Sequence, residues 1–578
     1  MIWEIALGIS IGVLLISFVW AICAKKMRYK IIIGGVTVST FAMYFPIYIN
    51  EFEGESFRIF KTFVVTIQKT IKSFGLSGDL FFFMDNSAGL EPRIRELYLI
   101  LATVLIIIAP LITFIVALSF FKNASAYMKF YRKYYSDTYV FSELNEEALA
   151  LAKSLKSNNK KRTIVFTDVF ENNDDDGLQI KAKELGAILF KKDILGTKFS
   201  FHSKESKITF FIMGADDDDN LSKTLSLIER YGENENMLLY VFTTSINSEL
   251  LLSKSATGKM KVRRINRVQS LISRHLYDNG MSIFENAIQS ENEEKLISAL
   301  IIGLGESGME MTKALSWFGQ MDGYKLEVNV FDIDGKASER LCYDCPELMD
   351  EKHNHDFQTK GEAHYSIDVH AGIDVQTKEF LDRVDKVNKP TYIFISLGCD
   401  KRNIQMAVTL RTWLLKKGCY PRIDAVVRDV NRKDALAGIT NYSGQEYDIH
   451  FIGDTKTSYS EEVIFESDIE EEALKRHMKW GKEEEFWKFE YNYRSSVASA
   501  IHRKMKIICK IPGADKEPHE RTEEEKWALR ELEHRRWNAY MRSEGFTYAK
   551  KRNNLAKTHH CLVPFDELSL EEQEKDDD

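Results

Sequence analysis

The sequence predicts a membrane region of three helices, then two doubly wound α/β units in tandem, then a mainly helical C-terminal domain. Three observations indicate this order. Three uncharged apolar stretches fall within the first 122 residues, short apolar runs alternate with helical patterns from about residue 137, and the same rhythm restarts at residue 298. The predicted boundaries are 1–122, a connector 123–136, then 137–296, 297–470 and 480–578.

The three apolar stretches, 5–24, 31–49 and 97–121, contain no charged residue. Each is close to the roughly 20 residues that a helix needs to cross a bilayer. The first stretch is not typical of a cleaved signal peptide, because it lacks a basic start and follows Glu4. We therefore expect a lipid bilayer as a partner.

Basic residues predict the orientation of the spans. Four lie in the short loop after the first span and four follow the third: Lys25, Lys26, Arg28 and Lys30, then Lys122, Lys129, Arg132 and Lys133. Loops rich in Lys and Arg stay in the cytoplasm. This places the N-terminus outside, residues 50–96 outside or re-entrant, and all later domains inside, as in a multi-pass protein of the inner (plasma) membrane.

The segment 56–84 between the second and third spans predicts a helix, because Ile59, Phe63, Ile67 and Ile71 recur at four-residue spacing. The order span, half-dipping helix, span, cytoplasmic domain is also that of a simple potassium channel subunit. However, "FGLSGD" (74–79) lacks the Thr-Val-Gly-Tyr-Gly filter pattern. Basic residues along the segment also disfavour a cation path, so an interfacial helix is favoured over a pore helix.

A glycine turn opens the second α/β unit. Gly303, Gly305 and Gly308 follow an apolar run and precede a helical pattern, with Glu306 and Ser307 inside the turn. In this arrangement backbone amides and a helix N-terminus face the phosphates of a nucleotide. An acid for the ribose is expected after the second strand, where Asp332 and Asp334 both qualify.

The first α/β unit departs from that pattern. Residues 142–147 read Ser-Glu-Leu-Asn-Glu-Glu, and later strand ends carry Asp168 and the run Asp216 to Asp219. Side chains there would block close backbone approach, and carboxylates would repel a diphosphate. We expect this unit to be an oligomerisation scaffold, or to bind a cationic or uncharged ligand.

Two Rossmann-like units after membrane helices resemble the RCK or TrkA-N regulatory domains of potassium channels and transporters, over about residues 135–465. The resemblance implies NAD, ATP or a cyclic nucleotide second messenger as the ligand. Tandem units of this kind that dimerise or form a ring would pull on the connector and tilt the third span, in which Pro110 is a plausible hinge.

The segment 523–567 is similar to the ryanodine receptor repeat (RyR) domain. The matching residues are Glu533, His534, Arg536, Trp537, Gly545, Phe546, Tyr548, Arg552, His560, Pro564 and Asp566. Aromatic faces and guanidinium groups suit a nucleotide, and a second set of donors lies upstream at an expected helix N-terminus. The candidate binding residues are therefore Arg494, Ser495, Ser496, Arg536, Trp537, Tyr540, Tyr548 and Arg552. The alternative is that Glu533, Arg536 and Trp537 only form a packed, paired helix.

Catalytic and metal sites find little support. No acid or base can be singled out for hydride transfer, and His364 and His370 are expected to be core or surface residues. Cys342 and Cys345 form a CxxC pair followed by His353 and His355, but no second CxxC exists. The other cysteines are scattered, as in reduced intracellular proteins.

A net charge of −8 argues against a dedicated nucleic-acid binder.

The leading hypothesis is a nucleotide-gated channel or membrane-permeabilising effector that forms a homo-oligomer. The two resemblances imply a role in bacterial signalling or phage defence. A pore-less regulatory receptor or transporter-associated subunit is the second hypothesis, favoured by the missing filter motif. A membrane-anchored NAD-dependent enzyme is the third.

The basic loops predict a testable topology. A reporter fused at residue 85 should be labelled from outside the cell, whereas reporters at residues 27 and 140 should not, because basic loops stay in the cytoplasm. Accessibility of each site to a membrane-impermeant reagent measures this. Cytoplasmic labelling at residue 85 would contradict the three-span topology.

Overall fold

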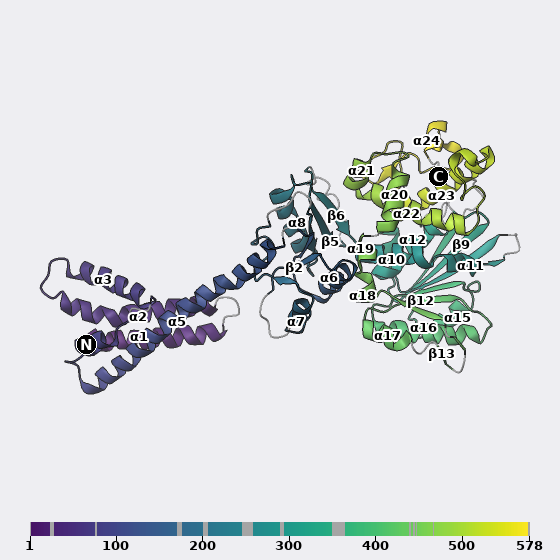
Figure 1. The fold of residues 1–578 in the computed structure, drawn as a ribbon. Helices are drawn as coiled ribbons and strands as arrows, with labels where there is room; N and C mark the ends of the chain where they lie inside the picture. The colour runs from purple at the N-terminus through teal and green to yellow at the C-terminus, as the bar shows by residue number, and fades with distance from the viewer. Residues whose placement is uncertain are drawn as a thin grey trace. The chain divides into compact units, whose positions relative to one another are not determined.

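The computed structural model describes residues 2–23, 28–75, 78–133, 135–169, 176–199, 206–244, 258–289, 294–349, 364–437, 441–442, 445–446, 448–465 and 467–575. The chain divides into two compact units, Met1–Lys129 and Phe130–Asp578. The predicted fold class is confirmed: three candidate spans lie near the N-terminus, followed by two parallel doubly wound sheets and a helical C-terminal region. Figure 1 shows the elements of both units.

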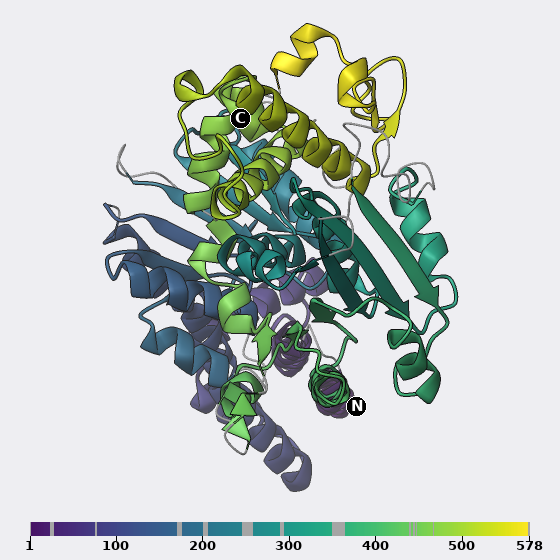
Figure 2. The ribbon, with the colours of Figure 1, turned by 90° about the vertical axis from the view of Figure 1, so that its right-hand side faces the viewer.

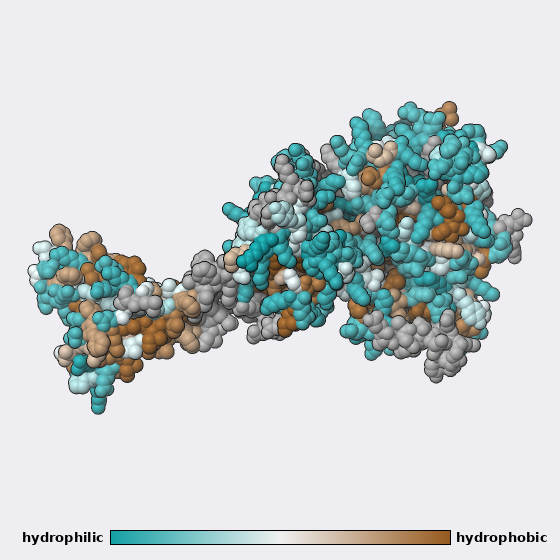
Figure 3. All heavy atoms as spheres, viewed as in Figure 1, coloured by the Kyte–Doolittle hydropathy of each residue, from teal (hydrophilic) through white to brown (hydrophobic). Residues whose placement is uncertain are grey.

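The N-terminal unit holds three helices that are long and apolar enough to cross a membrane. They are α1 (Ile2–Cys23), α2 (Arg28–Glu51) and α5 (Pro92–Tyr131). The apolar windows are Ile2–Trp20, Ile31–Glu51 and Pro92–Phe114. Figure 3 shows a band of hydrophobic residues across the visible face of this unit, as expected for helices that are surrounded by lipid. Of the basic residues used to predict topology, Lys25 and Lys26 lie outside the described residues.

Small and hydroxyl-bearing residues hold α1 against α2. The Ser10 hydroxyl donates to the carbonyl of Ser39 at 3.1 Å, and the Ser39 hydroxyl donates to the carbonyl of Ser10 at 3.0 Å. A Cβ atom at Gly35 would lie only 2.2 Å from the Ser17 hydroxyl oxygen. Close backbone approach through small residues is the usual basis of helix packing in membranes, where no hydrophobic effect drives association.

The predicted helix between the second and third spans is α3 (Arg58–Ser73), followed by the short α4 (Leu80–Asn86). The buried side of α3 consists of Thr62, Thr66, Thr70 and Ser73. Its apolar side chains are exposed: Ile59, Phe60, Phe63, Val64, Ile67 and Ile71. The helical periodicity is confirmed, and the apolar side suits lipid, whereas the interfacial placement stays a prediction. Leu76 and Ser77 of the "FGLSGD" segment lie outside the described residues.

Most of the predicted connector is helical, because α5 is a single helix of 40 residues that runs to Tyr131. Pro110, the expected hinge, lies inside this helix.

The first sheet of the α/β unit is parallel, with strand order β3-β2-β1-β4-β5-β6. The strands are β1 (Thr138–Phe141), β2 (Thr163–Phe166), β3 (Ile188–Leu189), β4 (Ile208–Ile212), β5 (Met237–Phe242) and β6 (Lys261–Ile265). The helices between them are α6 (Glu146–Asn158), α7 (Asp176–Glu184) and α8 (Asp217–Tyr231). Continuous buried apolar runs form β1, β2 and β4, as expected for strands covered on both faces.

The second sheet repeats this topology with the order β10-β9-β8-β11-β12-β15. Its strands are β8 (Lys295–Ile302), β9 (Tyr324–Asp332), β10 (Tyr365–Ala371), β11 (Tyr392–Ile395), β12 (Arg422–Val426) and β15 (Ile449–Ile452). The short β7 (Ile288–Gln289) pairs antiparallel with β8, and β13 (Asn441–Tyr442) with β14 (Gln445–Glu446).

Helices cover both faces of the second sheet (Figures 1 and 2). One hydrophobic cluster joins one face to α12 (Glu306–Phe318) and α13 (Ala337–Asp344). A separate cluster joins the other face to α15 (Lys378–Val384) and α16 (Asp400–Leu415), which α17 (Val430–Ala437) follows in sequence. The order 3-2-1-4-5-6 places a change of winding direction between β8 and β11, where α/β sheets open a crevice for ligands.

The two α/β parts exchange helices. Helix α10 (Arg267–Asn279) follows β6 and precedes α11 (Met281–Glu285), yet packs in the hydrophobic cluster of α12. In return α18 (Thr455–Ser458) and α19 (Glu461–Phe465) follow β15 but contact α6. Arg162 pairs with Glu461 at 2.6 Å, and His275 Nε2 lies 2.9 Å from the buried Asp424 carboxylate. The two sheets are thus interlocked.

The C-terminal region is mainly helical: α20 (Ser467–His477), α21 (Glu483–Lys488), α22 (Glu490–Ile508), α23 (Glu523–Ser543) and α24 (Leu570–Glu574). Two single 3-10 turns, Pro518–Glu520 and Phe565–Glu567, and the short parallel pair β16 (Thr547–Tyr548) and β17 (Thr558–His559) complete it. Helices α22 and α23 share one hydrophobic cluster with α10 and α12. Figure 2 shows the C-terminal helices beside the second sheet.

Strand β6 was not predicted, because three of its five residues are basic. It is an edge strand, and its arginines are covered by the C-terminal helices. The Arg263 guanidinium lies 3.7 Å from the centre of the Tyr493 ring and pairs with Glu470. Arg264 pairs with Glu490 at 2.8 Å, and Arg494 also binds Glu490. Burial alone would raise the pKa of Glu490, but Arg264 and Arg494 outweigh it and lower that pKa to about 2.

This ionic junction predicts a pH dependence of stability. Because the pKa of Glu490 is lower in the folded chain than its usual value of 4.5, its contribution is full above pH 4.5 and is lost as the pH falls towards about 2. Glu490→Gln should cost about 3 kcal/mol at pH 7, because two buried guanidiniums lose their partner. The difference from the natural chain should shrink below pH 4, as followed by circular dichroism during urea unfolding.

Glu472→Gln is the matched control. Glu472 pairs with Arg503 at 2.7 Å, but both side chains are about 30% exposed, and exposed pairs contribute little. An equal effect of the two substitutions at pH 7 would contradict the role given to the junction.

Candidate functional site

The glycine turn lies at the carboxyl end of β8, where it leads into α12. Gly303 has φ +94°, and a Cβ atom there would lie 2.6 Å from the carbonyl oxygen of Ser396. A Cβ atom at Gly308 would lie only 1.8 Å from the carbonyl oxygen of Gly303. These two glycines therefore permit a sharp turn and a close approach of α12 to β8, as glycines do in dinucleotide-binding turns.

Gly305 has a different environment, because nothing lies within 4 Å of a Cβ atom placed there. It precedes α12 and provides no side-chain cap for it. The first N–H groups of a helix lack partners within the helix and attract anions. Gly305 thus leaves the N-terminus of α12 open toward the adjoining cleft.

That cleft has a volume of about 360 Å³. Its lining comes from the carboxyl ends of β9 and β12, the loops after β8 to β12, and the first turns of α12 and α16. The lining residues are Gly303, Gly305, Glu306, Ser307, Asp332, Ile333, Ile373, Asp374, Val375, Gln376, Ser396, Leu397, Gly398, Asp400, Arg402, Asn403, Val426 and Arg428. Arg402 and Arg428 are exposed side chains that can reach an anion. Gly308 does not line the cleft, consistent with its buried, structural position.

Only one of the two candidate acids, Asp332, lines the cleft. Asp332 lines the cleft, and its carboxylate accepts hydrogen bonds from the N–H groups of Leu304 at 2.5 Å and Asp334 at 2.7 Å. It therefore positions the glycine turn, while lone pairs remain for a ligand hydroxyl. Asp334 lies outside the cleft lining and pairs with Arg340 at 2.9 Å.

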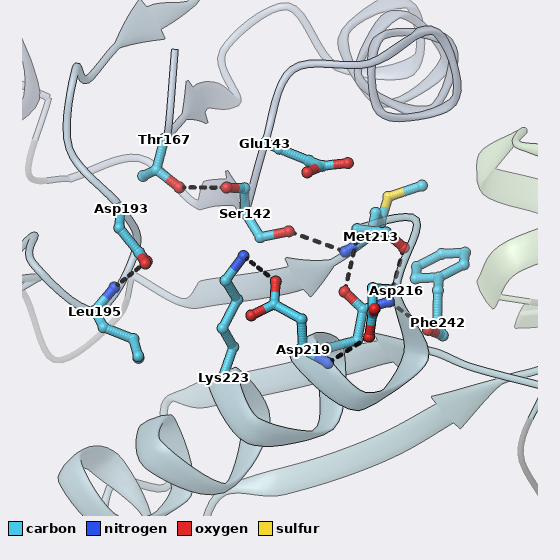
Figure 4. A network of polar contacts seen from close by, with 12 residues as sticks. Ser142, Glu143, Thr167, Asp193, Leu195, Met213, Asp216, Asp219, Lys223 and Phe242 are labelled. Carbon is cyan, nitrogen blue, oxygen red and sulfur yellow. Dashed lines mark hydrogen bonds and ion pairs between the residues drawn. The ribbon is translucent and has the colours of Figure 1, made fainter. Parts of the chain in front are cut away.

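The same place in the first sheet is filled by side chains (Figure 4). Ser142 Oγ accepts from the N–H of Met213 at 3.0 Å. The Asn145 amide donates to Glu143 at 2.8 Å and to the Met213 carbonyl at 2.9 Å. Burial raises the pKa of Glu143, although the Asn145 hydrogen bond opposes this. These contacts fit the expectation that the first unit is a scaffold, which stays a prediction.

In both sheets, nevertheless, an asparagine makes the same pair of hydrogen bonds at the carboxyl ends of the strands. Asn220 of α8 accepts from Gly214 N–H at 2.8 Å and donates to the Phe242 carbonyl at 3.0 Å. Asn403 of α16 makes the equivalent bonds to Leu397 N–H at 2.6 Å and to the Val426 carbonyl at 2.7 Å. In each case an asparagine ties the end of the fourth strand to the end of the fifth.

Aspartates repeat in the same way. Asp217, the first residue of α8, accepts from the N–H of Thr244 at 3.0 Å. Asp400, the first residue of α16, accepts from the N–H groups of Arg428 and Asp429 at 3.1 and 2.9 Å. Asp400 is therefore occupied by loop amides and adds less repulsion to the cleft than its charge suggests.

A second cavity of about 380 Å³ lies in the C-terminal region. Of the candidate residues there, Ser495, Ser496, Arg536, Trp537 and Arg552 line it. Trp537 stands edge-on to His559 with ring centres 4.9 Å apart. The structure brings these five residues together although Ser495 and Arg552 lie 57 positions apart in the sequence.

Three other candidates lie elsewhere. Arg494 and Tyr540 border a cavity of only about 40 Å³ at the ionic junction, where Arg494 binds Glu490 and Gln269. Tyr548 is 49% exposed and does not line the larger cavity. The expected helix N-terminus near residue 494 is also wrong: α22 begins at Glu490, so residues 493–496 belong to its first two turns.

Sequence reasoning missed two buried cations close to Glu533, namely Arg476, which lines the C-terminal cavity, and Lys506, which does not. Both cations belong to helical stretches rich in charged residues, which are typical of solvent-exposed helix faces. The position of Lys506 could have been predicted, because it lies at helical spacing from the buried apolar residues of α22.

The histidines and cysteines lie as follows. His370 Nε2 is 3.1 Å from Asn329 and its ring stacks on Phe331, and burial lowers its pKa. Cys345 is buried, its Sγ donates to the Ser543 carbonyl at 3.0 Å, and burial raises its pKa to about 12. A thiol held protonated in this way is a poor metal ligand. His353 and His355 lie outside the described residues.

One further group has ligand atoms within 4.8 Å of one another, namely His559, His560 and Cys561 beside the C-terminal cavity.

No protein-family model matches this chain, and no curated protein matches it. The resemblances to RCK or TrkA-N domains and to the RyR domain therefore rest on the motifs alone.

The geometry of the turn predicts opposite outcomes for two glycines. Gly308→Ala should destabilise the α/β unit by roughly 1–3 kcal/mol, because the new methyl group meets the Gly303 carbonyl. Gly305→Ala should be nearly neutral, since the methyl group enters open space at an ordinary φ of −71°. Thermal unfolding measures both, and equal melting temperatures would contradict the roles assigned to the two positions.

Proposed function

We propose that this protein is a membrane-anchored receptor that binds a cytoplasmic nucleotide in the cleft at the glycine turn. NAD, ATP and a cyclic nucleotide second messenger are the candidate ligands. The supporting observation is the open position of Gly305 at the N-terminus of α12, flanked by two buried glycines whose Cβ atoms could not be accommodated. A diphosphate can approach this backbone closely, and Arg402 and Arg428 offer further donors.

The proposed output is opening of a channel or permeabilisation of the membrane, in bacterial signalling or phage defence. A ligand acts only if it binds two arrangements of the protein with different free energy. Helix α12 is suited to report occupancy, because its first turn borders the cleft while Glu310 and Lys313, further along, border the ionic junction. We expect a homo-oligomer, since closed symmetric assembly is common and would add the effects of several subunits.

The second candidate is a pore-less regulatory receptor or transporter-associated subunit. It is favoured by the sequence of 74–79, which lacks a potassium filter pattern, and by the basic residues Arg58, Lys61, Lys69 and Lys72 of α3. We do not expect an enzyme, although turnover of NAD(P)H by purified protein would revive that hypothesis.

The test uses full-length protein in nanodiscs and isothermal calorimetry with NAD, ATP and cyclic di-AMP as probes. Gly305→Asp should weaken binding at least about 100-fold, because a carboxylate enters the space of the phosphates without disturbing the fold. Gly177→Asp is the control: it adds the same charge at an exposed glycine of the first unit with open space around it.

The same proteins in dye-loaded liposomes separate the two candidate outputs. Leakage triggered by the bound nucleotide, and abolished by Gly305→Asp, would support a channel or permeabilising effector. Binding without leakage would support the pore-less receptor. Unchanged affinity in the Gly305→Asp protein would refute the proposed site.

A further inference from the structure

Three buried cations surround the Glu533 carboxylate at the floor of the C-terminal cavity, and two of them, Arg476 and Arg536, line it. The Glu533 carboxylate lies 2.8 Å from Arg536, 3.3 Å from Lys506 and 3.9 Å from Arg476. Side-chain exposure is 2% for Arg536, 0% for Lys506, 6% for Arg476 and 8% for Glu533. Three buried cations thus lie within 4 Å of this carboxylate. Removing charges from water is costly unless each is compensated.

A nearby cluster shows how this unit otherwise treats buried arginine. At the ionic junction Arg263 pairs with Glu470, Arg264 and Arg494 with Glu490, and Lys313 with Glu310. Burial lowers the pKa of Arg494, but Glu490 and then Glu544, which borders the same junction, raise it above its usual value. Cations and carboxylates there are matched four to four. At Glu533, by comparison, three buried cations lie close to the same carboxylate.

Arg536 also has an unused donor. Its Nε and Nη2 bind Glu533, whereas the buried Nη1 has no hydrogen-bond partner among the described residues. The side chain lines the cavity. A buried donor without a partner costs about 1–3 kcal/mol, and more when charged, unless a ligand or water satisfies it.

The pKa values of two neighbouring histidines are lowered by burial and by nearby cations. Burial, and then Lys506, lower the pKa of His502 to about 3. Burial, and then Arg552, lower the pKa of His559 to about 4. Both rings are therefore neutral at pH 7 and add no negative charge to the cluster.

Aromatic side chains form the walls above this floor. Trp537 lies between His534, with ring centres 5.8 Å apart, and His559 at 4.9 Å. Tyr491 stacks on Phe489 at 5.6 Å, and Trp480 is 48% exposed at the cavity. Flat ring systems bind well between such faces, and cavities of 300–1,000 Å³ are typical of small-molecule sites.

We propose that the C-terminal cavity binds a mononucleotide-sized ligand, with its phosphate at Arg536 and Arg476 and its ring against Trp537. Lys506 lies beneath the phosphate position and adds to the field. Arg552, exposed at the rim, completes the set of cations. This site is separate from the glycine turn and does not depend on the function proposed for it.

The test uses full-length protein carrying Gly305→Asp, so that binding at the glycine turn is impaired. Inorganic pyrophosphate probes the phosphate position, and AMP, GMP, CMP and UMP probe the ring. Pyrophosphate should raise the melting temperature saturably, and at least one nucleotide should bind about tenfold more tightly than pyrophosphate. Arg536→Gln should weaken both classes of probe about 10- to 100-fold, the usual range for one charge-assisted hydrogen bond.

Arg542→Gln is the matched control. Arg542 lies on the same helix, is 1% exposed and does not line the cavity. It should destabilise the protein while leaving affinity unchanged. If Arg536→Gln does not fold, Arg552→Gln at the exposed rim should weaken pyrophosphate about three- to tenfold, and Trp537→Ala should remove the preference for a nucleotide over pyrophosphate.

Three outcomes would overturn the proposal. They are no stabilisation by pyrophosphate or any nucleotide, equal loss of affinity in Arg536→Gln and Arg542→Gln, or an unchanged pyrophosphate affinity in Arg552→Gln together with an unchanged nucleotide preference in Trp537→Ala. These outcomes leave the glycine turn untouched, because that site is tested by Gly305→Asp in the otherwise natural chain. The two proposals can therefore fail separately.

Discussion

The close approach of α12 to β8 is the contact on which the α/β unit depends. It exists because neither Gly303 nor Gly308 has a side chain where the two backbones meet. The approach fixes the first turn of α12 at the edge of the cleft. It also fixes the opposite side of the helix, where Met311, Leu315 and Phe318 enter the hydrophobic cluster shared with α10, α22 and α23. Helix α12 therefore borders the polar cleft at its first turn and packs into the largest described hydrophobic cluster along its other side.

The exchange of helices between the two α/β parts also holds the two sheets together. Helix α10 leaves the first sheet to pack on the second, and Tyr459, which follows α18, packs on Phe242 of the first sheet with ring centres 6.1 Å apart. Neither sheet can shift without disturbing the other. The ionic junction adds directional contacts between β6, α10 and α22, so that a change at one sheet has a defined route to the C-terminal helices.

Regular features of the fold were predictable because each carries a local signal. Buried parallel strands require continuous apolar runs, and the glycine turn is marked by three glycines at fixed spacing, two of which the backbone requires. Strand β6 carried no such signal, since its arginines are compensated by residues more than 200 positions away, such as Glu470 and Glu490.

The candidate binding residues show a similar limit. Arg494 and Ser495 are neighbours in sequence but point about 100° apart around a helix, and so they border different cavities. Arg476 and Lys506 meet only through tertiary packing of α20, α22 and α23, which no spacing rule reveals. Five candidates of the C-terminal region do share one cavity, because residues from α22, α23 and the segment after α23 converge there.

The paired asparagines Asn220 and Asn403 have a meaning for the history of the chain. The two sheets have the same strand order, the same asparagine bridge and the same aspartate at the start of the following helix, as is expected of a duplicated unit. They differ at the first turn, where the second sheet has glycines and the first has Ser142, Glu143 and Asn145. One strand order and one asparagine bridge can therefore support two turns of quite different chemistry, one lined by glycines and one filled by side chains.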